Sequence, residues 1–154
     1  MMTIAFMGIL LGLAAIIPLL RNNKFYLINA ALVMGVTYYV ESNVVRIPVQ
    51  HLLSHKALLL FAILHLICIN FTTFVAYGVD KRAAVRHQWR VPEADLHTLE
   101  FLGGWIGAFI GQKVFHHKTA KKSFQRIYIL MIILEILAIW GIYNYLNLGK
   151  FNFF

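Results

Sequence analysis

The segment that decides the fold is residues 101–112, FLGGWIGAFIGQ, which is uncharged and holds four glycines. Two basic segments flank it, with Lys81, Arg82, Arg86 and Arg90 before it and Lys113, Lys118, Lys121, Lys122 and Arg126 after it. If the segment crosses a membrane, the flanks lie on opposite sides, and one of them violates the preference of basic loops for the cytoplasm. If it dips into the membrane and returns, or lies along the surface, both flanks are cytoplasmic.

Composition places the chain in a membrane. Of its 154 residues, 60% are apolar and 13% are charged, whereas a soluble domain is about half apolar and about a quarter charged. This balance excludes a disordered tail, and a single cysteine excludes a disulfide-rich secreted module. The length allows one membrane domain, residues 1–154.

Four apolar runs are predicted to span the membrane, namely residues 3–20, 25–40, 57–79 and 127–149. If residues 101–112 do not span, Arg21 and Lys24 join the nine flanking bases, giving 11 on one side. Arg46, Lys56 and Lys150 then give 3 on the other side. This asymmetry favours an all-α protein with four transmembrane helices, both termini outside, and a glycine-rich re-entrant or interfacial helix between the last two spans.

The alternative is a five-helix bundle in which residues 92–115 form one continuous helix. Such a helix is about 35 Å long, which is enough to cross a bilayer. Gly103, Gly107 and Gly111 recur every four residues and, with Gly104, predict a small-residue surface for close helix packing. The sequence leaves both folds open.

Polar residues of the third span share one face. On a helical projection, His65, Thr72, Thr73, Tyr77 and Asp80 fall within an arc of about 140°. Polar groups at membrane depth are costly, so this face is expected to contact protein or water. Hydrogen bonding between helices explains most of these residues. Asp80 ends the predicted span, where the helix dipole disfavours an acid, so it requires a cationic partner.

A short amphipathic stretch follows the third span. Pro92 suits the first position of a helix, and Glu93 and Asp95 suit its first turn. Glu93, His97 and Glu100 share one face at spacings of four and three residues. With His116 they are weak candidates for a metal such as zinc, manganese or iron, but a solvated helix face explains them as well. The sequence therefore predicts no metal firmly and no particular cofactor.

The densest polar constellation is residues 116–124, HHKTAKKSF. Histidines, lysines and hydroxyl groups within short reach can bind phosphate. The alternative is a topology signal resting on anionic headgroups, which explains the lysines better than the histidine pair. We expect Lys81, Arg90, Lys118, Thr119 and Lys121 to bind an anion, and Asp80, Glu93 and His117 to be the candidate catalytic groups.

Several short motifs resemble one small prokaryotic membrane family, the domain of unknown function DUF 1294. They are YGVDKRAA at 77–84, RVPE at 90–93, the glycines between 103 and 111, and HKT at 117–119 with Lys121 and Phe124. The resemblance covers roughly residues 64–146. It implies a multi-pass protein of the prokaryotic cell (inner) membrane and supplies no activity. It emphasises Asp80, Lys81 and Arg90, but not His97 or Glu100, which weakens the metal hypothesis.

Three functions fit these residues. The first is binding of a phosphate-bearing amphiphile, either a phospholipid or an isoprenoid phosphate, in transport or envelope maintenance. The second is a membrane-embedded lipid-phosphate hydrolase or transferase that uses Asp80 or Glu93 with His117, although the chain carries no HExxH, GxSxG or Walker motif. The third is a structural subunit of a larger membrane complex or a homo-oligomer. Nucleic-acid binding ranks below these because aromatic platforms are sparse. Membrane lipids are the expected partners.

The charged residues of the central region are predicted to converge. In the four-span fold, Asp80, Arg90, Glu93, His117 and Lys118 all lie at the membrane–cytoplasm boundary. An acid at a helix end needs a cation, and partly buried cations need acids. In the five-helix fold, His117 and Lys118 lie across the bilayer, about 30 Å away, and the cluster cannot form.

Overall fold

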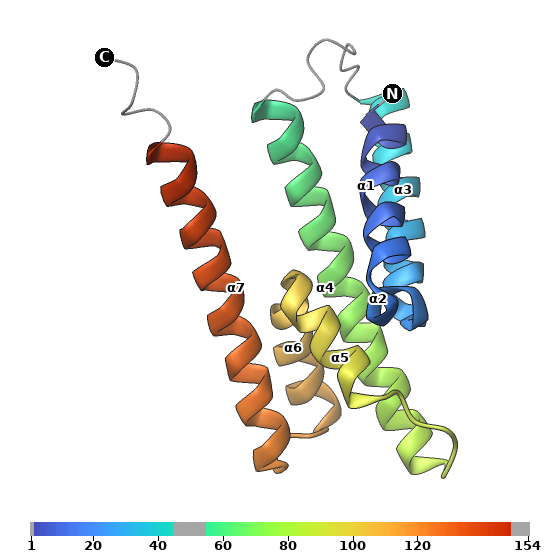
Figure 1. Cartoon of the computed structure of the whole chain (residues 1–154). Coiled ribbons are helices and arrows are strands. Elements are labelled where there is room, and N and C mark those ends of the chain that lie inside the picture. Colours follow the sequence, from blue (N-terminus) through green and yellow to red (C-terminus); the bar gives the residue numbers. More distant parts are fainter. Residues whose placement is uncertain (1, 45–54, 149–154) are drawn as a thin grey trace.

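The computed structural model describes residues 2–44 and 55–148, which form helices joined by turns, with no strand in these ranges (Figure 1). The elements are α1 (Met2–Ile16), α2 (Pro18–Asn22), α3 (Lys24–Asn43), α4 (His55–Val85), α5 (Glu93–Leu99), the π-helical turn η2 (Glu100–Gly104), α6 (Trp105–Phe115) and α7 (Lys122–Leu148). The predicted all-α class is confirmed. Arg46 and Lys150, which entered the charge count, lie outside the described residues.

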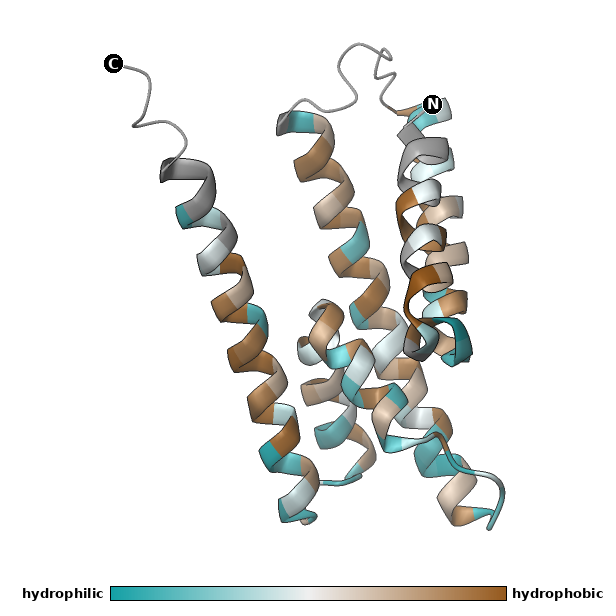
Figure 2. Ribbon diagram, viewed as in Figure 1, coloured by the Kyte–Doolittle hydropathy of each residue, from teal (hydrophilic) through white to brown (hydrophobic). Residues whose placement is uncertain are grey.

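Two of the helices are long and apolar enough to cross a membrane, one over Lys56–Val85 and the other over Lys122–Gly141. Many of their large apolar side chains point outward, including Leu59, Ile67, Ile136 and Trp140. Figure 2 shows hydrophobic residues along most of both helices and hydrophilic residues gathered toward the lower ends. Such continuous apolar surface is unusual on a water-soluble monomer.

The first predicted span is interrupted. Pro18 cannot donate a backbone hydrogen bond, so α1 ends at Ile16 and the short α2 begins at Pro18. Asn23 then caps α3, because its Oδ1 accepts a hydrogen bond from the Tyr26 amide at 3.1 Å. The Asn23 Nδ2 also donates to the backbone oxygen of Asp95 at 3.0 Å, which ties this corner to α5.

Helices α5 and α6 form a hairpin that lies between α4 and α7 (Figure 1). The chain reverses at Gly103, whose φ of 104° suits glycine and few other residues. Both ends of the hairpin therefore lie at the same end of α4. The continuous helix over residues 92–115, on which the five-helix alternative rested, is wrong. The single glycine-rich helix expected between the last two spans is also corrected, because the reversal divides it.

Glycines let α6 approach α4 closely. A Cβ atom on Gly107 would lie 2.0 Å from the backbone oxygen of Asn70, and one on Gly111 would lie 2.9 Å from the Tyr77 Cβ. Gly104 is equally tight against the Thr73 hydroxyl, at 2.1 Å. The predicted packing surface is thus confirmed for these three glycines. Gly103 stands apart from them because it occupies the reversal.

Polar side chains of α4 satisfy the backbone groups freed at the reversal. Asn70 accepts a hydrogen bond from the Gly107 amide at 2.7 Å and donates to the Gly103 oxygen at 2.9 Å. His65 Nε2 lies 3.2 Å from the Leu102 oxygen. Unpaired backbone groups are costly in apolar surroundings, so these hydrogen bonds stabilise the reversal of the chain at the tip of the hairpin. The polar face of the third predicted span therefore faces protein.

Candidate functional site

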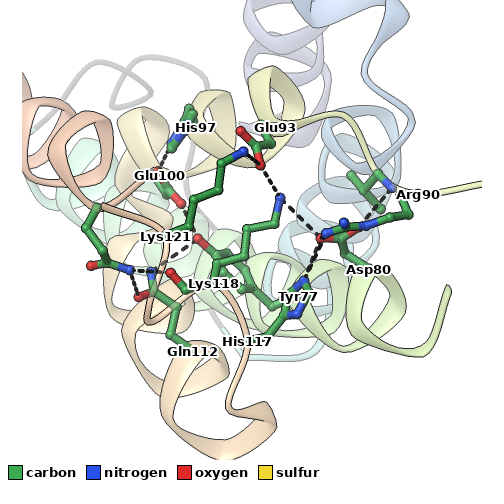
Figure 3. Close-up of polar contacts among 12 residues, drawn as sticks. Tyr77, Asp80, Arg90, Glu93, His97, Glu100, Gln112, His117, Lys118 and Lys121 are labelled. Atoms are coloured by element: carbon green, nitrogen blue, oxygen red, sulfur yellow. Dashed lines mark hydrogen bonds and ion pairs between the residues drawn. The ribbon is translucent and has the colours of Figure 1, made fainter. Parts of the chain in front are cut away.

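Asp80 is the centre of a charged cluster, and its side chain is fully buried (Figure 3). Its Oδ1 accepts hydrogen bonds from Arg90 Nε and from the Val91 amide, both at 3.2 Å. Its Oδ2 lies 3.1 Å from Arg90 Nη2 and 2.7 Å from His117 Nε2. Lys118 Nζ is 3.4 Å from the same oxygen. Both carboxylate oxygens are therefore fully occupied.

Lys118 joins Asp80 to a second carboxylate. Its Nζ donates to Glu93 Oε1 at 2.8 Å, and Lys121 donates to the same oxygen at 2.7 Å. The Lys118 side chain is only 4% exposed, whereas that of Lys121 is 53% exposed. Lys118 also lies 4.8 Å above the centre of the Phe124 ring, which adds a cation–π contact. Lys118 is thus a buried bridge, and Lys121 faces outward.

The loop between α6 and α7 positions His117 and Lys118 through two residues with left-handed backbone conformation. His116 ends α6 in the left-handed region with a φ of 46°, and Lys118 repeats that conformation with a φ of 61°. Left-handed backbone is uncommon for residues other than glycine. The two left-handed residues bend the chain so that both His117 and Lys118 reach Asp80, and the resulting ion pairs offset the strain.

The charged contacts shift two pKa values outside the apolar helices. The hydrogen bonds from Lys118 and Lys121 lower the pKa of Glu93 to about 2. The hydrogen bond to Asp80 raises the pKa of Arg90 above its ordinary value. Both groups are therefore charged throughout the physiological range.

The predicted convergence of Asp80, Arg90, Glu93, His117 and Lys118 is confirmed by these contacts, and Lys121 joins them. Two predicted anion-binding residues lie outside the cluster, because Thr119 is exposed and Lys81 makes no described contact with it. One detail is corrected. Asp80 does not end its helix, since α4 continues to Val85. Asp80 needs cationic partners because its carboxylate is buried, and not because it lies at the negative end of a helix dipole.

A second buried polar cluster lies beside the first, on α4, α5 and α6 (Figure 3). Glu100, fully buried, accepts a hydrogen bond from the Tyr77 hydroxyl, and its Oε2 lies 2.6 Å from His97 Nδ1. Gln112 donates to the Tyr77 oxygen at 3.3 Å and accepts from Gln125 at 2.6 Å. With Glu100 on η2 and Gln125 on α7, the cluster thus joins five elements by a chain of hydrogen bonds.

Of the weak metal candidates, only His97 and Glu100 lie in contact with one another within the described residues. Glu93 is engaged by two lysines, and His116 is exposed at the end of α6. Within the described ranges, no group of three or more histidine, cysteine, aspartate or glutamate side chains could hold a metal ion. Glu93, His97 and Glu100 share a helix face but form no metal site. Lys118, which follows α6, donates a hydrogen bond to the Glu93 carboxylate and so engages it.

Three residues of these networks were missed by the sequence-based prediction, namely Asn70, Gln112 and Gln125. Each is a single amide with no charge or motif to mark it. Asn70 was detectable, because a lone amide in an apolar run of 23 residues must find a partner. Nothing in the sequence marks Gln112 and Gln125 as partners of one another.

An apolar cavity of about 510 Å³ lies between α2, α5 and α7. Ile17 and Leu20 line it from the first helices, Ala94 and Phe101 from the hairpin side, and Met131 and Leu134 from α7. His97, which belongs to the second polar cluster, also lines this cavity. Cavities of this size accommodate small molecules or parts of lipids.

Fold and site together define a small all-α protein with two potential membrane-spanning helices and a helical hairpin clamped by buried ion pairs. Residues 70–124 match the family described as "Protein of unknown function (DUF1294)". A relative, "Uncharacterized protein YsdA" from Bacillus subtilis (strain 168), is 35% identical over 75 residues, which are 49% of this chain and 84% of that protein. The chain belongs to this family, as the resemblance implied. No solved structure gives a significant match.

Proposed function

We propose that this chain is a multi-pass protein of the bacterial cell membrane that binds a phosphate-bearing amphiphile at its cytoplasmic end. The observation that carries the proposal is the position of the apolar cavity. Its lining residues Ala94 and Ile127 are the sequence neighbours of Glu93 and Arg126, and Glu93 pairs with Lys121, so charged residues lie one position before the lining on both α5 and α7. A phosphate-bearing amphiphile needs an apolar cavity for its hydrocarbon chain and nearby basic residues for its anionic headgroup.

Four spans are proposed for the membrane topology, formed by α1 with α2, by α3, by α4 and by α7. The loops on either side of the hairpin lie at one end of the molecule, because His117 contacts Asp80 and Lys118 contacts Glu93. These loops hold most of the basic residues. The preference of basic loops for the cytoplasm supports placing this end inside the cell, with the cavity in the cytoplasmic leaflet.

Not every base of the cluster is free to bind a headgroup. His117 and Lys118 are buried and engaged by carboxylates, so we assign them to holding the hairpin. Lys121 has one carboxylate partner and a 53% exposed side chain. Its remaining donors, with the exposed neighbours Lys122 and Arg126, suit a phosphate at the cavity mouth.

Catalysis is the less favoured alternative. A carboxylate acting as nucleophile or base needs a free oxygen, and both oxygens of Asp80 already accept two or more hydrogen bonds. The roles of Asp80, Glu93 and His117 in a lipid-phosphate hydrolase or transferase stay a prediction. The third possibility, a structural subunit, draws support from the exposed apolar upper half of α7.

Native mass spectrometry of the purified protein tests the proposal. The wild type is expected to retain an anionic phospholipid or isoprenoid phosphate. Lys121→Gln is expected to lose most of it, whereas Lys56→Gln, which removes an exposed base at the opposite end of α4, retains it. Equal retention by both variants, or a wild type without anionic lipid, overturns the proposal.

A further inference from the structure

Three helices line the apolar cavity, and each carries a charged residue one position from its lining, namely Arg21 on α2, Glu93 on α5 and Arg126 on α7. Asn23 Nδ2 donates to the Asp95 oxygen at 3.0 Å, so α2 meets α5 within two residues of Arg21 and of Glu93. From these residues the lining continues for seven or eight residues along the hairpin and along α7, which is about 10–12 Å. The three charged residues therefore lie at one end of the cavity.

The charged residues at this end form a rim with an excess of positive charge. The rim holds five bases, namely Arg21, Lys118, Lys121, Lys122 and Arg126. It holds two acids, Glu93 and Asp95. Arg90 and Asp80 lie beside the rim and form a bidentate pair without net charge. The rim thus has three more bases than acids, and a ligand with several negative charges would balance it.

Three of the rim bases have no acidic partner of their own. Arg21, Lys122 and Arg126 are exposed and form no ion pair within residues 2–44 and 55–148. The remaining exposed base, Lys121, shares Glu93 Oε1 with Lys118. An arginine offers parallel N–H groups that match two oxygens of one phosphoryl group. Because the two arginines stand on different walls of the cavity, an anion at its end can be bound from two sides.

The number of phosphoryl groups distinguishes the headgroups that this rim could bind. A phosphodiester lipid such as phosphatidylglycerol carries a single negative charge, and a phosphate monoester carries about 1.5–2. A second phosphoryl group adds at least one further charge and a second set of acceptor oxygens. Of these three headgroups, the diphosphate best matches the charge of the rim and offers one phosphoryl group to each arginine.

We propose that the ligand of this site is a diphosphate ester of a hydrocarbon chain, with Arg21 and Arg126 binding the diphosphate and the chain lying in the cavity. This inference rests on the proposed function and narrows it, because it selects a diphosphate over the single phosphate of a phospholipid or an isoprenoid monophosphate. Arg21 is then a specificity residue. It lies outside residues 70–124, the part of the chain that matches the family, so the N-terminal helices contribute to this preference.

Two probes with the same chain test the inference. The purified, delipidated protein is titrated with farnesyl diphosphate and with farnesyl monophosphate at low ionic strength, and binding is followed by native mass spectrometry. The wild type is expected to bind the diphosphate about tenfold more tightly, which corresponds to one further charge-assisted hydrogen bond. Arg21→Gln is expected to lose most of this preference. Arg82→Gln, which removes an exposed arginine of α4 outside the rim, is expected to keep it.

The outcomes separate the two proposals. Equal binding of both probes by the wild type, with both weakened by Lys121→Gln, overturns the diphosphate inference and leaves the proposed function intact. A diphosphate preference that persists in Arg21→Gln also overturns the inference. If inorganic diphosphate binds as tightly as farnesyl diphosphate, the cavity does not hold the chain and the inference is wrong. Binding of neither probe above the level of farnesol overturns the proposed function as well.

Discussion

His117 Nε2 lies 2.7 Å from Asp80 Oδ2, although 37 residues separate them in the sequence. The intervening chain leaves α4, climbs through α5, reverses at Gly103 and descends through α6 (Figure 1). A contact this short cannot coexist with a helix that crosses a bilayer between the two residues. This buried contact therefore fixes the hairpin and, with it, the relative placement of the two basic loops.

The two loops are expected to lie on the same, cytoplasmic side of the membrane. With the buried Cys68 replaced by alanine, cysteines at Arg86 and Lys122 should resist labelling by an impermeant reagent in intact cells. A cysteine at Lys56, at the other end of α4, should be labelled. Labelling at only one of the two loop positions would contradict the hairpin, and labelling at both would reverse the orientation.

Gly107→Ala is expected to destabilise the protein, whereas Gly8→Ala is expected to leave it unchanged or more stable. In a helix, alanine normally gains about 0.5–1 kcal/mol over glycine, and no atom lies within 4 Å of a Cβ on Gly8. On Gly107 the Cβ would lie 2.0 Å from the Asn70 oxygen, so α6 must move at a cost of about 1–3 kcal/mol. Thermal unfolding in detergent measures both, and the same sign for both would contradict the packing.

Asn70→Leu is expected to lower stability by about 1–3 kcal/mol, because it leaves the Gly107 amide and the Gly103 oxygen without their partner. Thr72→Val is the matched control, since the buried Thr72 hydroxyl has no hydrogen-bond partner within the described residues. That control should be neutral or stabilising. A loss of stability in Thr72→Val as large as in Asn70→Leu would show that the hydrogen bonds are not the cause.

Asp80→Asn is expected to destabilise the protein by about 3–5 kcal/mol, because it removes the carboxylate that pairs with Arg90 and leaves the buried Lys118 with Glu93 as its remaining acidic partner. Asp95→Asn provides the comparison. Asp95 is half-buried, no ion pair to it appears within the described residues, and burial raises the pKa of its carboxyl. Its loss should cost a few tenths of a kcal/mol through the helix dipole. Equal losses in chemical denaturation would contradict a central role for Asp80.

The Glu93 ion pairs predict a specific acid dependence. Lys118 and Lys121 lower the pKa of Glu93 from 4.5 to about 2. A carboxyl whose pKa is lower in the folded state stabilises the protein above its unfolded pKa, and this stabilisation is lost as the pH falls from about 4.5 toward 2. The side chain is 38% exposed, so screening limits the effect to about 1 kcal/mol or less.

The corresponding measurement is the melting temperature of wild type and Glu93→Gln at several pH values. The wild type should melt higher above pH 5, and the difference should shrink in the acid range. Added salt should also reduce it at neutral pH. A difference that stays constant from neutral pH to the acid range would show that Glu93 acts through packing rather than charge.

The sequence by itself determined the helical class and the positions of the long apolar helices. Apolar runs over residues 57–79 and 127–149 need no long-range information, because their length and composition suffice. It also predicted the charged cluster, since a buried acid requires a cation and the basic loops were the available source. The distribution of bases also predicts that these loops lie on the cytoplasmic side.

Only the tertiary structure decided how the middle of the chain is used. Four glycines are compatible with a continuous helix and with a hairpin, and the left-handed backbone of Gly103 and the contacts of Asn70 select the hairpin. The hairpin also brings Lys118 to Glu93. Because Glu93 pairs with this lysine, it does not join His97 and Glu100 in a metal site. Local spacing predicts which residues share a helix face. Which partner each residue meets depends on the return of the chain, because the competing lysine lies 25 residues further along the chain.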